Sequence, residues 1–306
     1  AMSTRLLDGF QSRLLDAYGT QVIHQAWKPV TVFLNGKYWG HMNLRERVDR
    51  FFIAQFEGLS LDQADEMDIL EANGSVNFGS NKAYRAMLKK IKAGSPATNP
   101  DDLQYILDNV DVDNLFEYMA LEMFVGNSDI GNIRYYRLHQ EGSKWKWIWY
   151  DADYGLYSSK FNSPWSYLKV KGMGEQKIDN TIFLKLLEHP DYKRKFLEKL
   201  ADVYKTFTTE YMTQVLDGVV AEIQPEMKNH WERWGELNDK AVTSEVPTTI
   251  DGAYTYWESR VNRLYNTLKV RPHRLWDFIK DEFKLTKTEM EELFGPQPDY
   301  PDDAVL

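Results

Sequence analysis

Apolar residues recur at helical spacing along most of this chain. Residues 4–18 show the pattern and stop at Gly19. The same spacing predicts helices at residues 45–56, 81–92, 101–109, 113–126, 181–188, 190–205, 209–235, 253–268 and 271–283. Apolar, β-rich runs predict strands at residues 30–34, 38–44, 133–139 and 145–151. A β-containing front, a central hairpin and a helical rear together indicate an α+β fold.

Polar stretches divide this pattern. Asn35-Gly36 predicts a type I′ turn between the first two strands, because both residues tolerate positive φ. Residues 93–100 are the best boundary between two lobes, which gives a front part at 1–93 and a rear part at 101–295. Residues 158–178 resemble a mobile loop facing a substrate, and 238–252 form a second polar break. The tail 296–306 is expected to be flexible.

Composition excludes several classes of protein. The 306 residues carry a net charge of −9, which argues against a nucleic-acid binder and does not favour an anionic membrane surface. No run approaches the ~20 apolar residues of a membrane span. Without cysteine there are no disulfides, thiolate zinc sites or cysteine nucleophiles. The six histidines show no metal-ligand spacing.

The stretch 125–157 carries the clearest chemistry. Asp129 and Asn132 lie in a short polar loop, two predicted strands follow, and the second strand runs into Asp151 and Asp153. A hairpin brings its two ends together, so these four side chains are expected to converge. One Asp can orient a hydroxyl nucleophile while an Asn and other Asp groups hold Mg²⁺ against phosphates.

Asp151 and Asp153 are two residues apart at a predicted strand end. Their side chains would then point to one face, roughly 6.6 Å apart along the strand. Two carboxylates at that separation can grip a divalent cation. The alternative is that they cap a turn, but carboxylates beside a strand that enters the core need a compensating cation.

The residues after the first hairpin are a second candidate region. Arg45, Glu46 and Arg47 are predicted to begin a helix directly after a strand. Glu46 could pair with a phosphate-binding lysine, or it could be a solvated first-turn acid favoured by the helix dipole. No glycine-rich phosphate loop is recognisable.

The ten tryptophans suggest a third hypothesis for the function, a glycosidase. Trp145, Trp147, Trp149 and Trp165 could form a sugar platform beside paired carboxylates. Alternating tryptophans in a strand more often pack against a core.

Several separated motifs resemble the spore coat protein CotH-type atypical protein kinases. Residues 27–49, WKPVTVFLNGKYWGHMNLRERVD, are similar to that family's strand, hairpin and following NxRExxD-like stretch. Residues 112–118 resemble the helix before its catalytic loop, 126–133 the loop itself, and 144–155, KWKWIWYDADYG, its metal-binding strand. Further matches in the rear half are Leu186-Leu187, Pro225-Glu226-Met227, His230 to Trp234, and Arg271-Pro272.

The resemblance implies a two-lobed, atypical protein-kinase-like fold with a mainly helical C-terminal lobe. It implies transfer of the ATP γ-phosphate to Ser or Thr of a secreted or coat protein, with Mg²⁺ or Mn²⁺ as cofactor. Asp129 matches the catalytic Asp, with Asn132 beside it, and Asp151 matches the metal-binding Asp. Asn132 and Asp153 are implied metal helpers, and Arg45 and Glu46 lie in the motif expected at the nucleotide. The implied location is extracellular, at the cell envelope or in the spore coat of a bacterium, with any leader removed.

A second hypothesis is a non-catalytic relative that binds a protein partner or an envelope polymer. The family's earlier strands, including those expected to carry an ATP-contacting lysine, would lie before residue 1. Either the chain starts inside a single kinase-like domain, or part of the nucleotide lobe is lost. The substrate protein and the oligomeric state do not follow from the sequence.

Overall fold

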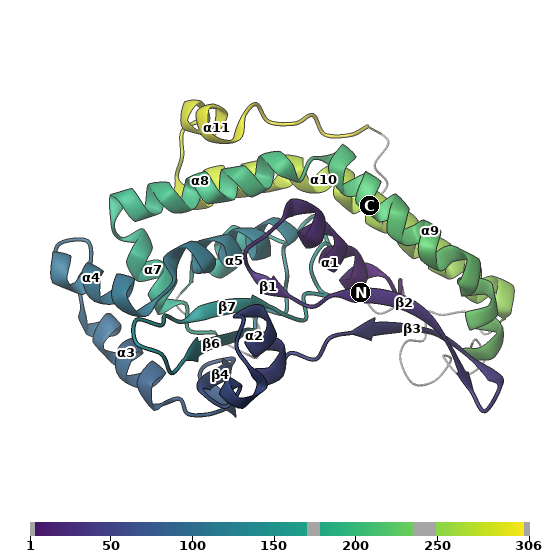
Figure 1. The fold of residues 1–306 in the computed structure, drawn as a ribbon. Coiled ribbons are helices and arrows are strands. Elements are labelled where there is room, and N and C mark those ends of the chain that lie inside the picture. The colour runs from purple at the N-terminus through teal and green to yellow at the C-terminus, as the bar shows by residue number, and fades with distance from the viewer. Residues whose placement is uncertain (1–3, 170–177, 235–248, 303–306) are drawn as a thin grey trace.

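The computed structural model of the chain describes residues 4–169, 178–234 and 249–302. Strands and helices are mixed, which confirms the α+β prediction (Figure 1). The strands are β1 (Ile23–His24), β2 (Trp27–Leu34), β3 (Lys37–Arg45), β4 (Met67–Glu71), β5 (Ser75–Phe78), β6 (Arg134–Leu138) and β7 (Lys146–Trp149). The front helices are α1 (Leu7–Tyr18), α2 (Arg50–Phe56), the 3₁₀ helix η1 (Leu61–Gln63), α3 (Lys82–Ala93) and α4 (Pro100–Asn109). The remaining helices are α5 (Val112–Val125), α6 (Ser163–Tyr167), α7 (Thr181–Leu187), α8 (Pro190–Thr206), α9 (Thr209–Trp234), α10 (Ile250–Phe283) and α11 (Lys287–Phe294).

A five-stranded sheet has the order β1-β7-β6-β4-β5. β1 pairs with β7 in parallel, and the other pairs are antiparallel. Neighbouring residues on β6 face opposite ways: Tyr135 packs into the large core with α5, and Tyr136 into a smaller core with α2. The sheet is therefore covered on both faces. The sequence prediction missed β1, β4 and β5, because strands of two to five residues are too short to give a clear periodic signal.

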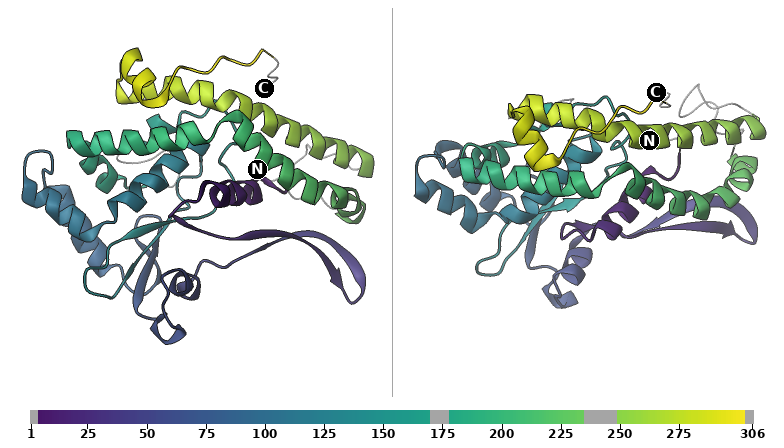
Figure 2. Two further views of the ribbon diagram at one scale, coloured as in Figure 1. Left: turned by 45° about the horizontal axis from the view of Figure 1, so that its top comes forward. Right: turned by 90° about the horizontal axis from the view of Figure 1, so that it is seen from above.

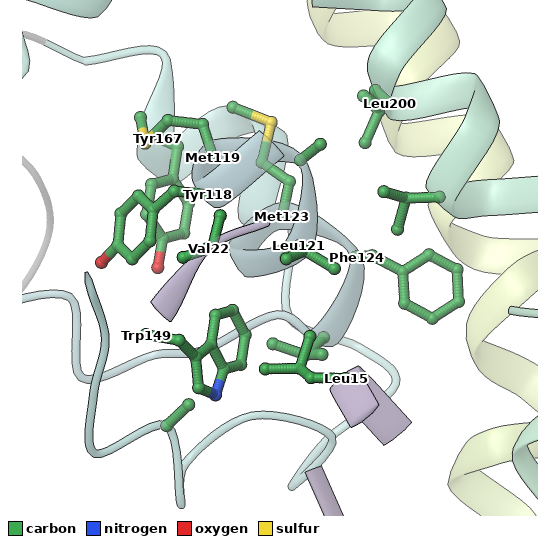
Figure 3. Close-up of a cluster of buried hydrophobic side chains, with 14 of the residues drawn as sticks. Leu15, Val22, Tyr118, Met119, Leu121, Met123, Phe124, Trp149, Tyr167 and Leu200 are labelled. Atoms are coloured by element: carbon green, nitrogen blue, oxygen red, sulfur yellow. The ribbon is translucent and has the colours of Figure 1, made fainter. Parts of the chain in front are cut away.

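Helix α5 is the centre of the large core (Figure 3). Of its 14 residues, 13 are buried, so it packs on every side, and the buried residues include the polar Asn114, Glu117 and Glu122. Asp111 begins the helix by accepting a hydrogen bond from the Asn114 amide. Gly126 ends it in the left-handed conformation, at φ 65°. These two ends fix where the following loop starts.

Long rear helices form a layer over α5, and α9 and α10 run side by side (Figures 1 and 2). The prediction of two helices at 253–268 and 271–283 is wrong, because α10 continues through Pro272. A proline in a helix leaves the carbonyl four residues earlier without its donor. Here the Thr209 hydroxyl donates to the Leu268 carbonyl at 3.4 Å, which offsets part of that loss.

The β2–β3 hairpin extends away from the sheet and lies along α9 (Figure 2). Asn35 and Gly36 both have positive φ, 51° and 76°, which confirms the predicted turn. A Cβ on Gly40 would lie 2.8 Å from the Trp234 indole nitrogen, so glycine allows the hairpin to approach α9 closely. The Trp234 indole donates to the Trp39 carbonyl at 2.6 Å.

Four further predictions concern loops, a boundary and the tail. Of the loop 158–178, residues 163–167 form α6, and 170–177 lie outside the described residues. Most of the break 238–252 also lies outside them. One core cluster contains residues from both sides of the boundary 93–100. In the tail, the Pro298 carbonyl lies 2.7 Å from a ring nitrogen of His273 on α10.

Candidate functional site

The loop 127–132 brings the predicted residues together directly after α5. The Asn132 side-chain nitrogen donates to Asp129 Oδ2 at 2.9 Å and to Asp151 Oδ2 at 3.0 Å. Strand β6 follows this loop and pairs with β7, which leads to Asp151. The hairpin thus places the two ends side by side, and the predicted convergence is confirmed for three of the four residues, Asp129, Asn132 and Asp151.

The prediction that Asp151 lies at the end of an extended strand is wrong. Strand β7 ends at Trp149, and Asp151 has a left-handed backbone with φ 51°. Asp adopts this conformation more readily than most residues do. The left-handed backbone interrupts the alternation of side chains along the strand, which would have pointed Asp151 and Asp153 to the same face. Gln11 of α1 holds the following turn by donating to the carbonyls of Ala152 at 2.7 Å and Gly155 at 3.1 Å.

Negative charge accumulates around Asp151. Burial raises the pKa of Asp129, and the Asp151 charge raises it further. Burial, then Asp151, then Asp8 raise the pKa of Asp153. Asp8 also has a raised pKa, from burial and against the lowering effect of Arg45, with which it forms an ion pair. Each carboxylate disfavours ionisation of its neighbours, so a bound cation would stabilise the group.

A cavity of about 440 Å³ opens beside Asp151. Its lining combines three arginines with three acids: Gln25, Arg45, Glu46, Arg47, Val48, Asp49, Asn77, Arg134, Tyr150 and Asp151. The predicted nucleotide residues Arg45 and Glu46 therefore share a cavity with the predicted metal residue Asp151.

Segment 45–49 consists of the end of β3 and a loop at residues 46–49, so the prediction that a helix begins at Arg45 is wrong. Arg45 is the last residue of β3, and α2 begins only after Asp49, whose side chain accepts from the amides of Phe51 and Phe52. The Glu46 carboxylate accepts from the Ala26 amide at 2.9 Å, a backbone partner rather than the lysine considered above.

Arg134 is a lining residue that the sequence analysis missed. Its guanidinium donates to the Val48 carbonyl at 2.7 Å, lies 3.5 Å from Glu71, and stacks over the Tyr150 ring at 4.0 Å. The available signal was a cation two residues after Asn132, at the start of a strand. The side chain of a strand's first residue points to one of the two faces of the sheet, but the sequence alone does not show which face.

The donor set around Asp151 suits a hard divalent cation. Mg²⁺ prefers oxygen ligands and is commonly held by one or two carboxylates together with substrate phosphates. One amide brings two carboxylates together here. Within residues 4–169, 178–234 and 249–302, no group of three or more His, Asp or Glu side chains is arranged so that it could hold a metal ion.

A sugar platform of the strand tryptophans is excluded by burial. Trp145, Trp147 and Trp149 are 0%, 5% and 5% exposed and pack in the large core. Trp165 is half-exposed, with the Lys169 ammonium over its ring. The alternative, that strand tryptophans pack against a core, is therefore confirmed for Trp145, Trp147 and Trp149.

The central hairpin β6–β7 thus brings together two carboxylates that one asparagine bridges, on an α+β fold. A protein-family model described as CotH kinase protein matches residues 1–275. Because the match covers most of the chain, this protein belongs to the CotH kinase family, as the sequence motifs indicated. A search of curated proteins finds no match. No helix in the described part of the chain combines the length and apolar character needed to cross a bilayer.

Proposed function

We propose that this chain is a metal-dependent atypical protein kinase that transfers the γ-phosphate of ATP to Ser or Thr of a secreted or coat protein. The observation that carries the proposal is the Asn132 amide, which joins Asp129 and Asp151 beside a cavity with three arginines. The β-containing front and the helical rear would serve as the two lobes. The family membership supports a location at the bacterial envelope or in the spore coat.

In this proposal Asp129 acts on the acceptor. Its carboxylate would take the proton of the Ser or Thr hydroxyl as that oxygen bonds to the γ-phosphorus. The bond from the γ-phosphorus to the bridging oxygen breaks, and ADP leaves. The raised pKa of Asp129, caused by burial and by Asp151, makes it a stronger base than an ordinary Asp.

Asp151, with Asp153 and Asn132, would hold Mg²⁺ or Mn²⁺. The bound ion would neutralise charge on the phosphates and fix their orientation. Asn132 now donates its amide nitrogen to both carboxylates, so ligation would use its oxygen.

The arginines would bind the rest of the triphosphate. Arg45 and Arg134 line the same cavity as Asp151 and have fixed neighbours: Asp8 for Arg45, and the Val48 carbonyl for Arg134. Guanidinium groups bind phosphate oxygens through paired donors. They would supply the charge that a lysine supplies in other kinases.

One titration tests the proposal. Calorimetry with ATP and Mg²⁺ or Mn²⁺ is expected to show metal-dependent binding for the wild-type chain. Asp151→Asn should lose that binding, because a metal ligand is gone. Asp129→Asn should keep nucleotide binding and lose at least about a hundredfold in transfer rate, since general-base catalysis contributes on that order.

The same experiment separates the main alternative, an inactive relative that binds a protein or an envelope polymer. Exposed apolar side chains on the β2–β3 hairpin favour that alternative: Phe33 and Leu44 are each 60% exposed. If the wild-type chain and both variants bind no nucleotide with either metal, the kinase proposal fails and partner binding becomes the leading function.

A further inference from the structure

Glu122 is a buried carboxyl group in the last turn of α5, just before the loop that carries Asp129. The residue is only 1% exposed to solvent. Tyr167 of α6 donates to Glu122 Oε2 at 2.9 Å and also lies 3.2 Å from the Asn127 carbonyl oxygen. The Glu122 main-chain carbonyl accepts from the amides of Gly126 and Asn127. One residue therefore contacts both the first turn of the loop and the helix that packs beside it.

The second carboxyl oxygen has a different environment. Glu122 Oε1 and the Tyr118 hydroxyl are both buried, and neither has a hydrogen-bond partner of normal geometry among the described residues. They are nevertheless close enough for each to shift the other's pKa. Figure 3 shows the hydroxyls of Tyr118 and Tyr167 turned the same way beside α5. A proton on Oε1 would give Tyr118 a donor and leave Oε2 free to accept from Tyr167.

We propose that Glu122 is a positioning residue that carries a proton and, in that form, ties the loop 127–132 to α5 and α6. Loss of the proton would leave a buried negative charge and release the loop. The importance of this loop for catalysis rests on the proposed function, but the proton-linked contact does not.

The charged and titratable groups around Glu122 support the protonated form. Burial raises the pKa of Glu122 from its usual 4.5 to about 7, against the lowering effect of Tyr167, Asn127 and Tyr118, and the charge of Asp129 adds to the rise. The nearby cation Arg271 donates to the carbonyls of Met123 and Phe124, and no ion pair joins it to Glu122 in the described residues. An unpaired buried carboxylate is costly, so the neutral acid is preferred.

The direction of the pH effect follows from linkage. In an opened loop, water would reach Glu122 and its pKa would return toward 4.5. The closed loop binds the proton more tightly, so its stabilisation is complete below about pH 4.5 and is lost as pH rises to about 7. Above that value opening no longer depends on this group. Each pH unit within the window changes the opening equilibrium by up to about tenfold.

Hydrogen exchange of the amides in loop 127–132 tests the proposal on the full chain, after correction for the intrinsic pH dependence of exchange. Wild type should open progressively more between pH 4.5 and 7 and then level off. Glu122→Gln, which keeps the shape and can donate to Tyr118 at every pH, should lose that component. Glu117→Gln is the matched control, because Glu117 is a buried acid on the same helix whose partners are Thr20 and Gln21.

Carbon-13 NMR of the glutamate carboxyls gives a second reading, with Glu122 assigned by its loss in Glu122→Gln. Its titration midpoint should lie near 7 and should fall in Asp129→Asn, because a neighbouring negative charge is removed. A midpoint near 4.5, or the same loop opening in wild type and Glu122→Gln at every pH, would overturn the proposal. Failure of nucleotide binding alone would count against the kinase function and leave this result standing.

Discussion

Two segments contribute to the site around Asp151, and the protein holds them by different means. Loop 127–132 follows the most buried helix and is fixed by groups that water does not reach. Arg271, which is 0% exposed, donates to the carbonyls of Phe124 at 2.8 Å and Met123 at 2.8 Å at the end of α5. Segment 45–49 lies at the surface, where Arg45 and Arg47 have side chains that are 39% and 90% exposed.

The contrast separates positioning from attraction. A base and a metal ligand must be held within a fraction of an ångström to react well, which favours a buried support. Arginines that attract a flexible triphosphate need only charge and reach, and solvent exposure keeps them available. We therefore expect substitutions behind the loop to change folding, and substitutions in segment 45–49 to change binding.

Arg271→Met should have the largest effect on stability. Arg271 also donates to the Phe161 carbonyl at 2.7 Å and the Ser163 hydroxyl at 2.6 Å, so its loss leaves several buried acceptors without donors. We expect a loss of about 3–5 kcal/mol in the free energy of unfolding, since each unmet buried group costs ~1–3 kcal/mol. Urea unfolding with an unchanged m value would measure it.

Two variants sharpen that result. Arg271→Lys keeps the charge but not the planar fork of donors, so it should fall between wild type and Arg271→Met. Arg45→Met removes an arginine of similar size from segment 45–49 and should cost under about 1 kcal/mol, as for exposed ion pairs. Equal losses in Arg271→Met and Arg45→Met would contradict the comparison.

The sequence could predict most of the helices and the central hairpin, because these depend on local signals. Asn35-Gly36 specifies the turn of the first hairpin, because both residues tolerate positive φ, and α5 is indicated by apolar residues at helical spacing. Strand β1 could not be found this way. It has two residues and exists only because β7, which is distant in sequence, lies beside it.

The part of the site that could be predicted is the part that the β6–β7 hairpin assembles, because a hairpin brings its two ends together. That argument correctly joined Asp129, Asn132 and Asp151. It failed at Asp151 itself, where a positive φ ends the strand early, because Asp occurs in extended, turn and left-handed conformations alike. Arg134 contacts Val48, and Glu122 contacts Tyr167, and because both partners are far away in the chain no local pattern encodes these contacts.

Arg134→Gln should have an intermediate effect, mainly on nucleotide affinity. Its side chain is only 16% exposed and is oriented by Val48 and Tyr150, so its guanidinium reaches the cavity with little loss of freedom. A charged hydrogen bond is worth about 1.5–3 kcal/mol, so we expect the ATP dissociation constant to rise at least about tenfold. Calorimetry at one ionic strength would measure it, with unfolding curves to confirm an intact fold. An affinity equal to wild type would place the triphosphate elsewhere.

Arg47→Gln should have the smallest effect. Its side chain is 90% exposed, and its ion pair with Asp49 is long, at 3.9 Å. We expect unfolding free energy to change by less than about 0.5 kcal/mol, as for most surface substitutions. The nucleotide association rate should fall by less than about threefold at low salt, and the difference should vanish near 0.5 M salt, where charges are screened beyond a few ångström. Stopped-flow binding at two salt concentrations would show this. A loss as large as that of Arg134→Gln, and independent of salt, would mean that Arg47 orders on the ligand and that segment 45–49 also positions it.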